Sequence, residues 1–119
     1  MAEGGHSEFC QVKITNNKKA SGFSVTITQH ICIFAERNVV ASLKTYAEQR
    51  LVKREVKLKD NGGSLEIIGK GQDGVLTENQ ENELFKYICK EFGFKLITSH
   101  GFAIGAAGDC PCTTWMFAK

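Results

Sequence analysis

The segment TENQENELFKYICKEFGFKLITS, residues 77–99, carries the clearest local structure signals in this 119-residue chain. Thr77 and Gln80 have the spacing of a capping box, which satisfies backbone N–H groups at the start of a helix. Apolar residues then recur at helical spacing: Leu84, Ile88 and Phe92. Gly93 suits the left-handed position that ends a helix, and alternation resumes at Phe94. The segment therefore predicts a helix over 77–92 and a strand over 94–99.

The remainder of the C-terminal region predicts a loop and a final strand. A glycine-rich, apolar stretch covers 99–108 and leads to Cys110-Pro111-Cys112. The glycines of this stretch favour irregular structure here. From Thr113 to Lys119 the residues alternate again, which predicts a strand that ends at the C-terminus.

The first half of the chain also switches between the two-residue alternation of strands and the 3.6-residue repeat of helices. Strands are predicted over 9–14 and 23–28, separated by a polar turn over 16–22. From about Glu36 the pattern becomes helical, with one apolar face: Val39, Val40, Leu43, Tyr46 and Ala47. Strands over 52–58 and 64–69 follow, joined by the hairpin signal Asp60-Asn61-Gly62-Gly63.

The predicted order is ββαββαββ, which indicates an α+β fold. Two helices covering one face of a largely antiparallel sheet would form a two-layer sandwich. We expect residues 1–8 to be a flexible tail and 9–119 to be a single domain. The expected core combines residues from strands and helices: Phe23, Val25, Ile27, Leu84, Ile88, Phe92, Leu96 and Trp115.

Composition narrows the range of functions. The net charge is +2, which does not require a nucleic-acid or membrane partner. The start of the chain has neither the positive residues nor the apolar stretch of a signal peptide. Five cysteines, an odd number, suit a reducing compartment. We therefore expect a cytoplasmic protein with no membrane contact and no cofactor, and more plausibly not an enzyme, because no catalytic motif is present.

One alternative is a thiol- or metal-dependent protein that uses His100, Cys110 and Cys112. Two close thiols and an upstream imidazole could share a metal, or a His-activated thiolate could act as a nucleophile. Zinc sites usually have a second pair of ligands, which here would have to come from His6, Cys10, His30 or Cys32. A turn stiffened by Pro111 is the simpler interpretation of this motif.

A second alternative is an RNA- or phosphate-binding module that uses Arg50, Lys53, Lys57 and Lys59. The region from Lys44 to Asp60 has an excess of three positive charges, and the three lysines are expected to share one face of a strand. The segment has no aromatic residue on which a base could stack. Lysines that protect a sheet edge explain the pattern equally simply.

The apolar stretch over 99–108 is the feature that most favours protein binding. A nearly uncharged surface segment either packs inward or contacts a partner. If it contacts a partner, Phe102 and Ile104 would be the apolar anchors, with His100 at their edge. Packing against its own sheet remains open at this point.

Four features of the C-terminal half have a counterpart in a known family. They are a strand over 65–69, an acidic-start helix ending in Phe92-Gly93-Phe94-Lys95, a strand leading to Ser99-His100-Gly101, and a last strand with Trp115 and Lys119. The stretch Phe23–Gln29, followed by Ile31, adds a similar opening strand. This pattern resembles the GTP cyclohydrolase feedback regulatory protein family. The resemblance implies a small, non-catalytic regulatory or protein–protein interaction module that assembles with itself or with an enzyme.

Overall fold

The computed structural model describes residues 9–59, 62–104 and 110–119, and confirms the α+β fold class. The predicted tail over 1–8 and the turn residues 60–61 lie outside this range. The elements in chain order are β1 (Phe9–Ser21), β2 (Ser24–Phe34), α1 (Arg37–Arg50), β3 (Glu55–Leu58), β4 (Ser64–Lys70), the 3-10 turn η2 (Gln72–Gly74), α2 (Glu78–Phe92), β5 (Lys95–Ile104) and β6 (Cys110–Ala118).

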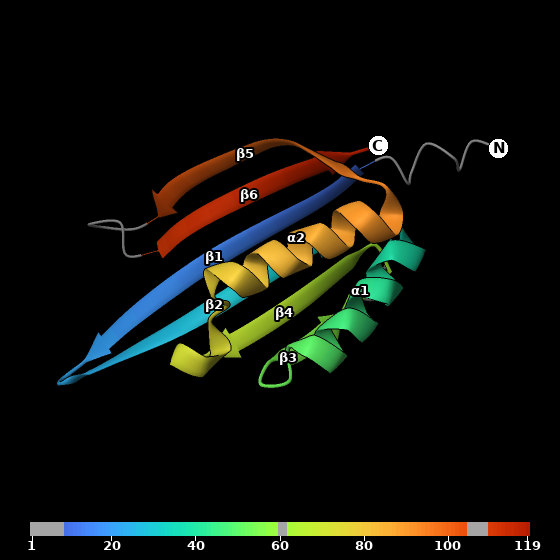
Figure 1. Ribbon diagram of the computed structural model, residues 1–119. Coiled ribbons are helices and arrows are strands. Elements are labelled where there is room, and N and C mark those ends of the chain that lie inside the picture. The colour runs from blue at the N-terminus through green and yellow to red at the C-terminus, as the bar shows by residue number, and fades with distance from the viewer. Residues whose placement is uncertain (1–8, 60–61, 105–109) are drawn as a thin grey trace.

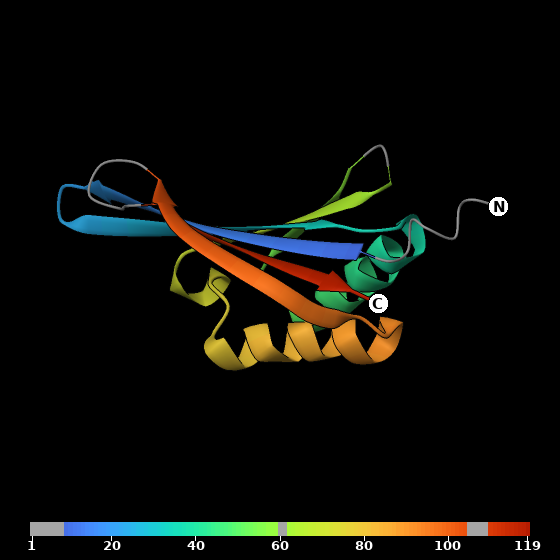
Figure 2. The same cartoon turned by 90° about the horizontal axis from the view of Figure 1, so that it is seen from above.

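The strands form one six-stranded antiparallel sheet with the order β3-β4-β2-β1-β6-β5. In Figure 1 the two longest strands, β1 and β2, cross the middle of the sheet and extend beyond it on one side. Figure 2 shows that α1 and α2 cover the same face. The opposite face carries no helix in the described part of the chain, and we call it the helix-free face.

The core lies between the helices and the sheet. The helices contribute Val39, Val40, Leu43, Ala47, Leu84 and Ile88, and the facing strands contribute Cys10, Val12, Ile14, Ile31, Ile33, Leu65, Ile67 and Phe117. On α1, four of the five residues predicted for the apolar face are buried, and the fifth, Tyr46, packs partly buried against the core. Among the described residues no helix is both long enough and apolar enough to cross a bilayer.

The caps of α2 form as the sequence predicts. The Thr77 hydroxyl accepts from the Gln80 backbone N–H at 3.2 Å, and the Gln80 side chain accepts from the Thr77 N–H at 2.9 Å. At the other end Gly93 adopts φ of 75° and donates to the Cys89 carbonyl at 3.0 Å. These contacts satisfy backbone groups that a helix leaves unpaired at its two ends.

The polar turn predicted over 16–22 is wrong, because β1 continues to Ser21 and the hairpin turns only at Gly22 and Phe23. Paired backbone groups in β1 and β2 satisfy each other whatever the side chains are. At the base of the protruding part, Gln29 is buried. Its side chain donates to Asn16 Oδ1 at 3.0 Å and accepts from the Leu76 N–H at 2.9 Å.

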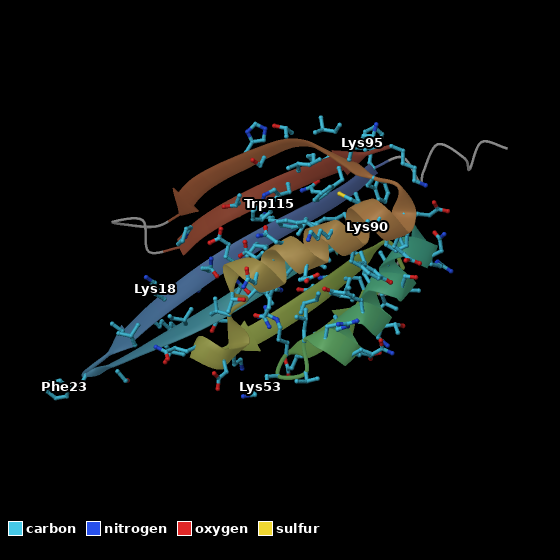
Figure 3. All side chains as sticks on the ribbon, in the orientation of Figure 1. Lys18, Phe23, Lys53, Lys90, Lys95 and Trp115 are labelled. Carbon is cyan, nitrogen blue, oxygen red and sulfur yellow. The ribbon has the colours of Figure 1, made fainter. Side chains whose placement is uncertain are left out.

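The expected core is correct for the helix and wrong for the hairpin. Leu84 and Ile88 are buried, and Phe92 and Trp115 pack partly buried against the core. Phe23 and Val25 are exposed, because the hairpin tip extends past both helices, as the label of Phe23 shows in Figure 3. Leu96 is also exposed. The alternation of apolar and polar residues in this hairpin therefore predicts a strand correctly but does not predict which side chains are buried.

The predicted loop over 99–108 is wrong for its first part, because β5 continues to Ile104. Likewise β6 begins at Cys110 and not at Thr113. Pro111 is tolerated there because β1 pairs with β6 only as far as Cys112, so on that side no ladder bond requires a proline N–H. β5 and β6 continue to pair with each other past Cys112, where the pairing of β6 with β1 ends, and Ile104 lies opposite Cys110.

Candidate functional site

A row of polar side chains crosses the helix-free face from one edge to the other. Directly opposed residues of antiparallel strands point to the same face, so the register defines the row. From β3 to β5 its members are Lys57, Glu66, Cys32, Lys13, Thr114 and His100. Their neighbours along β2, Ile31 and Ile33, are buried against the helices. This row on the face opposite the core is therefore polar from one edge of the sheet to the other.

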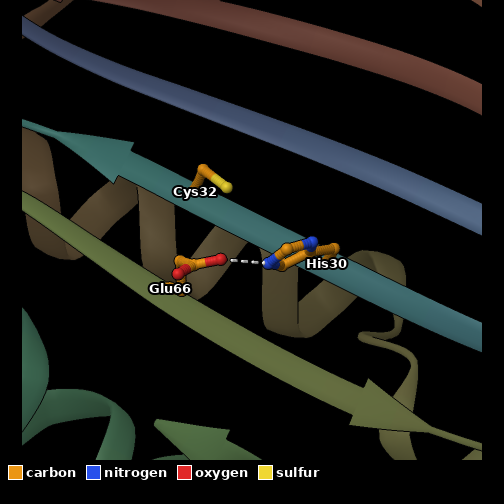
Figure 4. Close-up of side chains that lie close together, drawn as sticks. All are labelled: His30, Cys32 and Glu66. Atoms are coloured by element: carbon orange, nitrogen blue, oxygen red, sulfur yellow. Dashed lines mark hydrogen bonds and ion pairs between the residues drawn. The ribbon is translucent and has the colours of Figure 1, made fainter. Parts of the chain in front are cut away.

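Three potential ligands meet near the middle of this face, as Figure 4 shows. His30 and Cys32 lie two residues apart on β2, so both side chains point the same way. Glu66, on β4, is opposite Cys32 in the ladder. The donor atoms of these three side chains all lie within 4.8 Å of one another. We call them the His30–Cys32–Glu66 cluster.

Both carboxylate oxygens of Glu66 are occupied by cationic or N–H groups. His30 Nε2 donates to Oε1 over 2.7 Å, and Lys59 Nζ forms an ion pair with Oε2 at 2.8 Å. These two hydrogen bonds, the stronger from Lys59, hold the pKa of Glu66 below its usual range. The carboxylate is therefore ionised at neutral pH.

The thiol in the cluster is not activated for nucleophilic attack. Burial raises the pKa of Cys32, the Glu66 carboxylate raises it further, and the charges of Lys13 and Lys59 only partly oppose this. Nucleophilic cysteines depend on a depressed pKa. An imidazole, a thiol and a carboxylate at this separation suit the binding of a cation better than covalent catalysis.

The other candidate thiols lie in different surroundings. Cys112 is buried, and its Sγ accepts from Thr15 Oγ1 at 3.4 Å, whereas the side chain of Cys110 lies outside the described ones. His100 is exposed and pairs with Thr114, two ladder positions away from the Phe102–Cys112 pair and on the same face. The hypothesis of a thiol or metal site at His100, Cys110 and Cys112 stays a prediction.

The basic residues proposed for nucleic-acid binding do not form one surface. Lys57 lies on β3, and Lys59 is engaged in the ion pair described above. Lys53 precedes β3 and is not on the strand, so it does not share that face; its Nζ is 3.4 Å from Asp73 Oδ2. Arg50 lies in the last turn of α1, on the side of the sheet that carries the helices. The geometry therefore gives this alternative no added support.

β5 forms one edge of the sheet. It pairs with β6 on one side, and within the described part of the chain no strand pairs with the other side. After Lys95 its residues include no aspartate, glutamate, lysine or arginine. Leu96 and Ile97 are exposed, and a register shift beside them marks a bulge.

The three residues predicted to bind a protein partner all lie on this edge strand. His100 is exposed near the centre of β5. Phe102 and Ile104 occupy its last positions, and their side chains lie outside the described ones. The structure thus places the three residues in one strand and not in the loop that was expected to present them.

The His30–Cys32–Glu66 cluster was not predicted from the sequence. The period-two placement of His30 and Cys32 on one strand was a usable signal, since it puts both side chains on one face. Glu66 could not be added without knowing that β4 pairs with β2 in this register. Only the strand order supplies the third ligand.

The described elements define an open-faced α+β sandwich, with helices on one side of the sheet and the helix-free face on the other. The chain is similar in structure to a crystal structure of a conserved kinetoplastid-specific protein from Trypanosoma cruzi. The TM-score is 0.61 at 15% sequence identity, and the match covers 98% of this chain and 99% of that chain. At this identity the likeness shows the fold alone. No family model matches the chain, and no curated protein matches it.

Proposed function

We propose that this chain is a non-enzymatic protein-interaction module that self-assembles through its edge strand β5. The observation that carries the proposal is a ten-residue edge strand that has no charged residue after Lys95. An edge strand presents unpaired backbone N–H and C=O groups, which form a template for another strand. Strand addition to a sheet edge is a common mode of protein recognition.

The opposite edge of the sheet supports the choice of β5. β3 is only four residues long and carries Lys57, with Lys59 just beyond it. Short length and lysines are the usual means by which a sheet edge is protected from pairing. β5 is longer and lacks such charges along most of its length. The two edges thus differ in length and in lysine content, the features that decide whether a sheet edge accepts another strand.

A second copy of the chain is the partner that fits this edge. Antiparallel pairing of two β5 strands about His100 would place Leu96 and Ile97 of one copy opposite Ile104 and Ala103 of the other. No like charges would face each other, and Lys95 would lie at the outer end of the pair. The result would be a two-fold symmetric dimer with a self-complementary interface. A net charge of only +2 opposes such association weakly.

The test is sedimentation equilibrium of an Ile97→Lys variant. Ile97 is 64% exposed on β5, so lysine there is tolerated by the single chain but adds a charge to the proposed interface. We expect a dimer for the unaltered chain and a monomer for Ile97→Lys, with a melting temperature changed by only a few degrees, because exposed substitutions rarely exceed about 0.5 kcal/mol.

The matched control is Val52→Lys. Val52 is also an exposed apolar residue, at 77%, but it lies before β3 and far from β5 in the strand order. This variant should remain dimeric. A monomeric unaltered chain, or an Ile97→Lys variant that still dimerises, would contradict the proposal.

A further inference from the structure

We propose that His30 Nε2, Cys32 Sγ and Glu66 Oε1 form a binding site for Zn²⁺ on the helix-free face. The site lies in the middle of the sheet and not at the β5 edge, so it does not depend on the proposed assembly. It also differs in all its residues from the ligand set predicted near the C-terminus.

The sheet brings the three ligands together by its register alone. His30 and Cys32 come from alternate positions of β2, and Glu66 faces Cys32 from β4. Both strands are interior to the sheet, so their backbones are held on two sides. Among the described residues this is the group of three histidine, cysteine or acidic side chains that is close enough to hold a metal ion.

The donor set and its spacing suit Zn²⁺. Imidazole nitrogen, thiolate sulfur and carboxylate oxygen all bind this ion, at about 2.0–2.3 Å. Those bond lengths place tetrahedral ligands about 3.3–3.8 Å apart. The atoms here lie within 4.8 Å, and His30 Nε2 and Glu66 Oε1 are 2.7 Å apart. Side-chain rotations of these half-buried residues, without backbone movement, would bring all three to an ion placed between them.

Lys59 would act as an outer-shell partner. It holds Glu66 Oε2, which leaves Oε1 to coordinate the ion. Ligating carboxylates and imidazoles are commonly oriented by such second contacts. The ion would replace the shared hydrogen bond between His30 and Glu66. The imidazole would then carry its one proton on Nδ1, which leaves the Nε2 lone pair for the ion, and the Cys32 thiol would release its proton to solvent on coordination. Three protein ligands leave a fourth position for water.

The test uses Co²⁺ as a spectroscopic substitute for Zn²⁺, because a bound cobalt–thiolate pair gives a charge-transfer band. Titration of the full-length chain should produce this band at one Co²⁺ per chain, and Zn²⁺ should abolish it. In Cys32→Ser the band should disappear. The control, Cys89→Ser, removes a half-buried thiol of α2 and should retain it.

Two further variants keep the test decisive if Cys32→Ser folds poorly. His30→Gln and Glu66→Gln retain the thiol but each remove a ligand. Loss of an outer-shell partner alone weakens metal binding by about 10–100-fold, so each of these variants should weaken Co²⁺ binding by at least that factor. No thiolate band with the unaltered chain, or a band that survives Cys32→Ser, would overturn the proposal. A band lost in Cys110→Ser but kept in Cys32→Ser would move the site to the C-terminal thiols.

Discussion

Replacing Ile88 with alanine is expected to lower the free energy of unfolding by about 2–5 kcal/mol. Ile88 is fully buried on α2, in the core between the helices and the sheet, so its loss removes apolar burial and leaves a cavity. Denaturant unfolding followed by circular dichroism would measure the change as a lower midpoint at the same slope.

The control for this prediction is Phe23→Ala. Phe23 has the larger side chain but is fully exposed at the hairpin tip, so its truncation should change the free energy of unfolding by no more than about 0.5 kcal/mol. Equal losses for the two variants would show that the hairpin tip is packed and that the described core is incomplete.

A second large loss of stability is expected for Gly69→Ala. A Cβ at this position would lie 1.9 Å from the Gly74 carbonyl oxygen and 2.4 Å from Arg54 Nη1. The first neighbour is backbone and cannot rotate away, so overpacking should cost about 1–3 kcal/mol or more. Thermal unfolding would report this as a lower melting temperature.

Arg54 makes the surroundings of Gly69 especially intolerant. Its Nη2 donates to the Gln29 carbonyl at 3.2 Å, and burial lowers the pKa of its guanidinium to about 10. Nε and Nη1 are buried without a hydrogen-bond partner among the described residues. A shift of the guanidinium away from a new methyl would disturb its hydrogen bond to the Gln29 carbonyl.

Gly101→Ala is the matched control for Gly69→Ala. A Cβ at Gly101 would come no closer than 3.5 Å to a neighbouring atom, which is ordinary contact. The free energy of unfolding should stay within about 1 kcal/mol of the unaltered chain. A Gly69→Ala variant as stable as Gly101→Ala would contradict the close approach of Gly69 in β4 to Gly74 in η2.

The helix α2 could be predicted because its signals are local. Thr77 with Gln80 at one end and Gly93 at the other act within a few residues, and the structure forms both caps. The helical face of α1 follows from the same short-range periodicity. Such features do not depend on which other segments lie nearby.

The errors occurred where partner strands decide the outcome. Residues 16–21 are mostly polar and 101–104 are glycine-rich or apolar, so propensity favours turns or loops. Each is a strand because a neighbouring strand supplies its hydrogen bonds. In the same way, the His30–Cys32–Glu66 cluster and the position of β5 at the edge both follow from strand order, which local patterns do not contain.

The proposed assembly is tested most directly by sedimentation of two charge variants of His100, alone and mixed. Pairing about His100 would place the two copies of residue 100 directly opposite each other, where like charges destabilise and unlike charges stabilise. His100→Lys alone and His100→Glu alone should be monomeric, and their equimolar mixture should form a heterodimer. A mixture that stays monomeric while the unaltered chain dimerises, or single variants that dimerise as the unaltered chain does, would contradict pairing through β5.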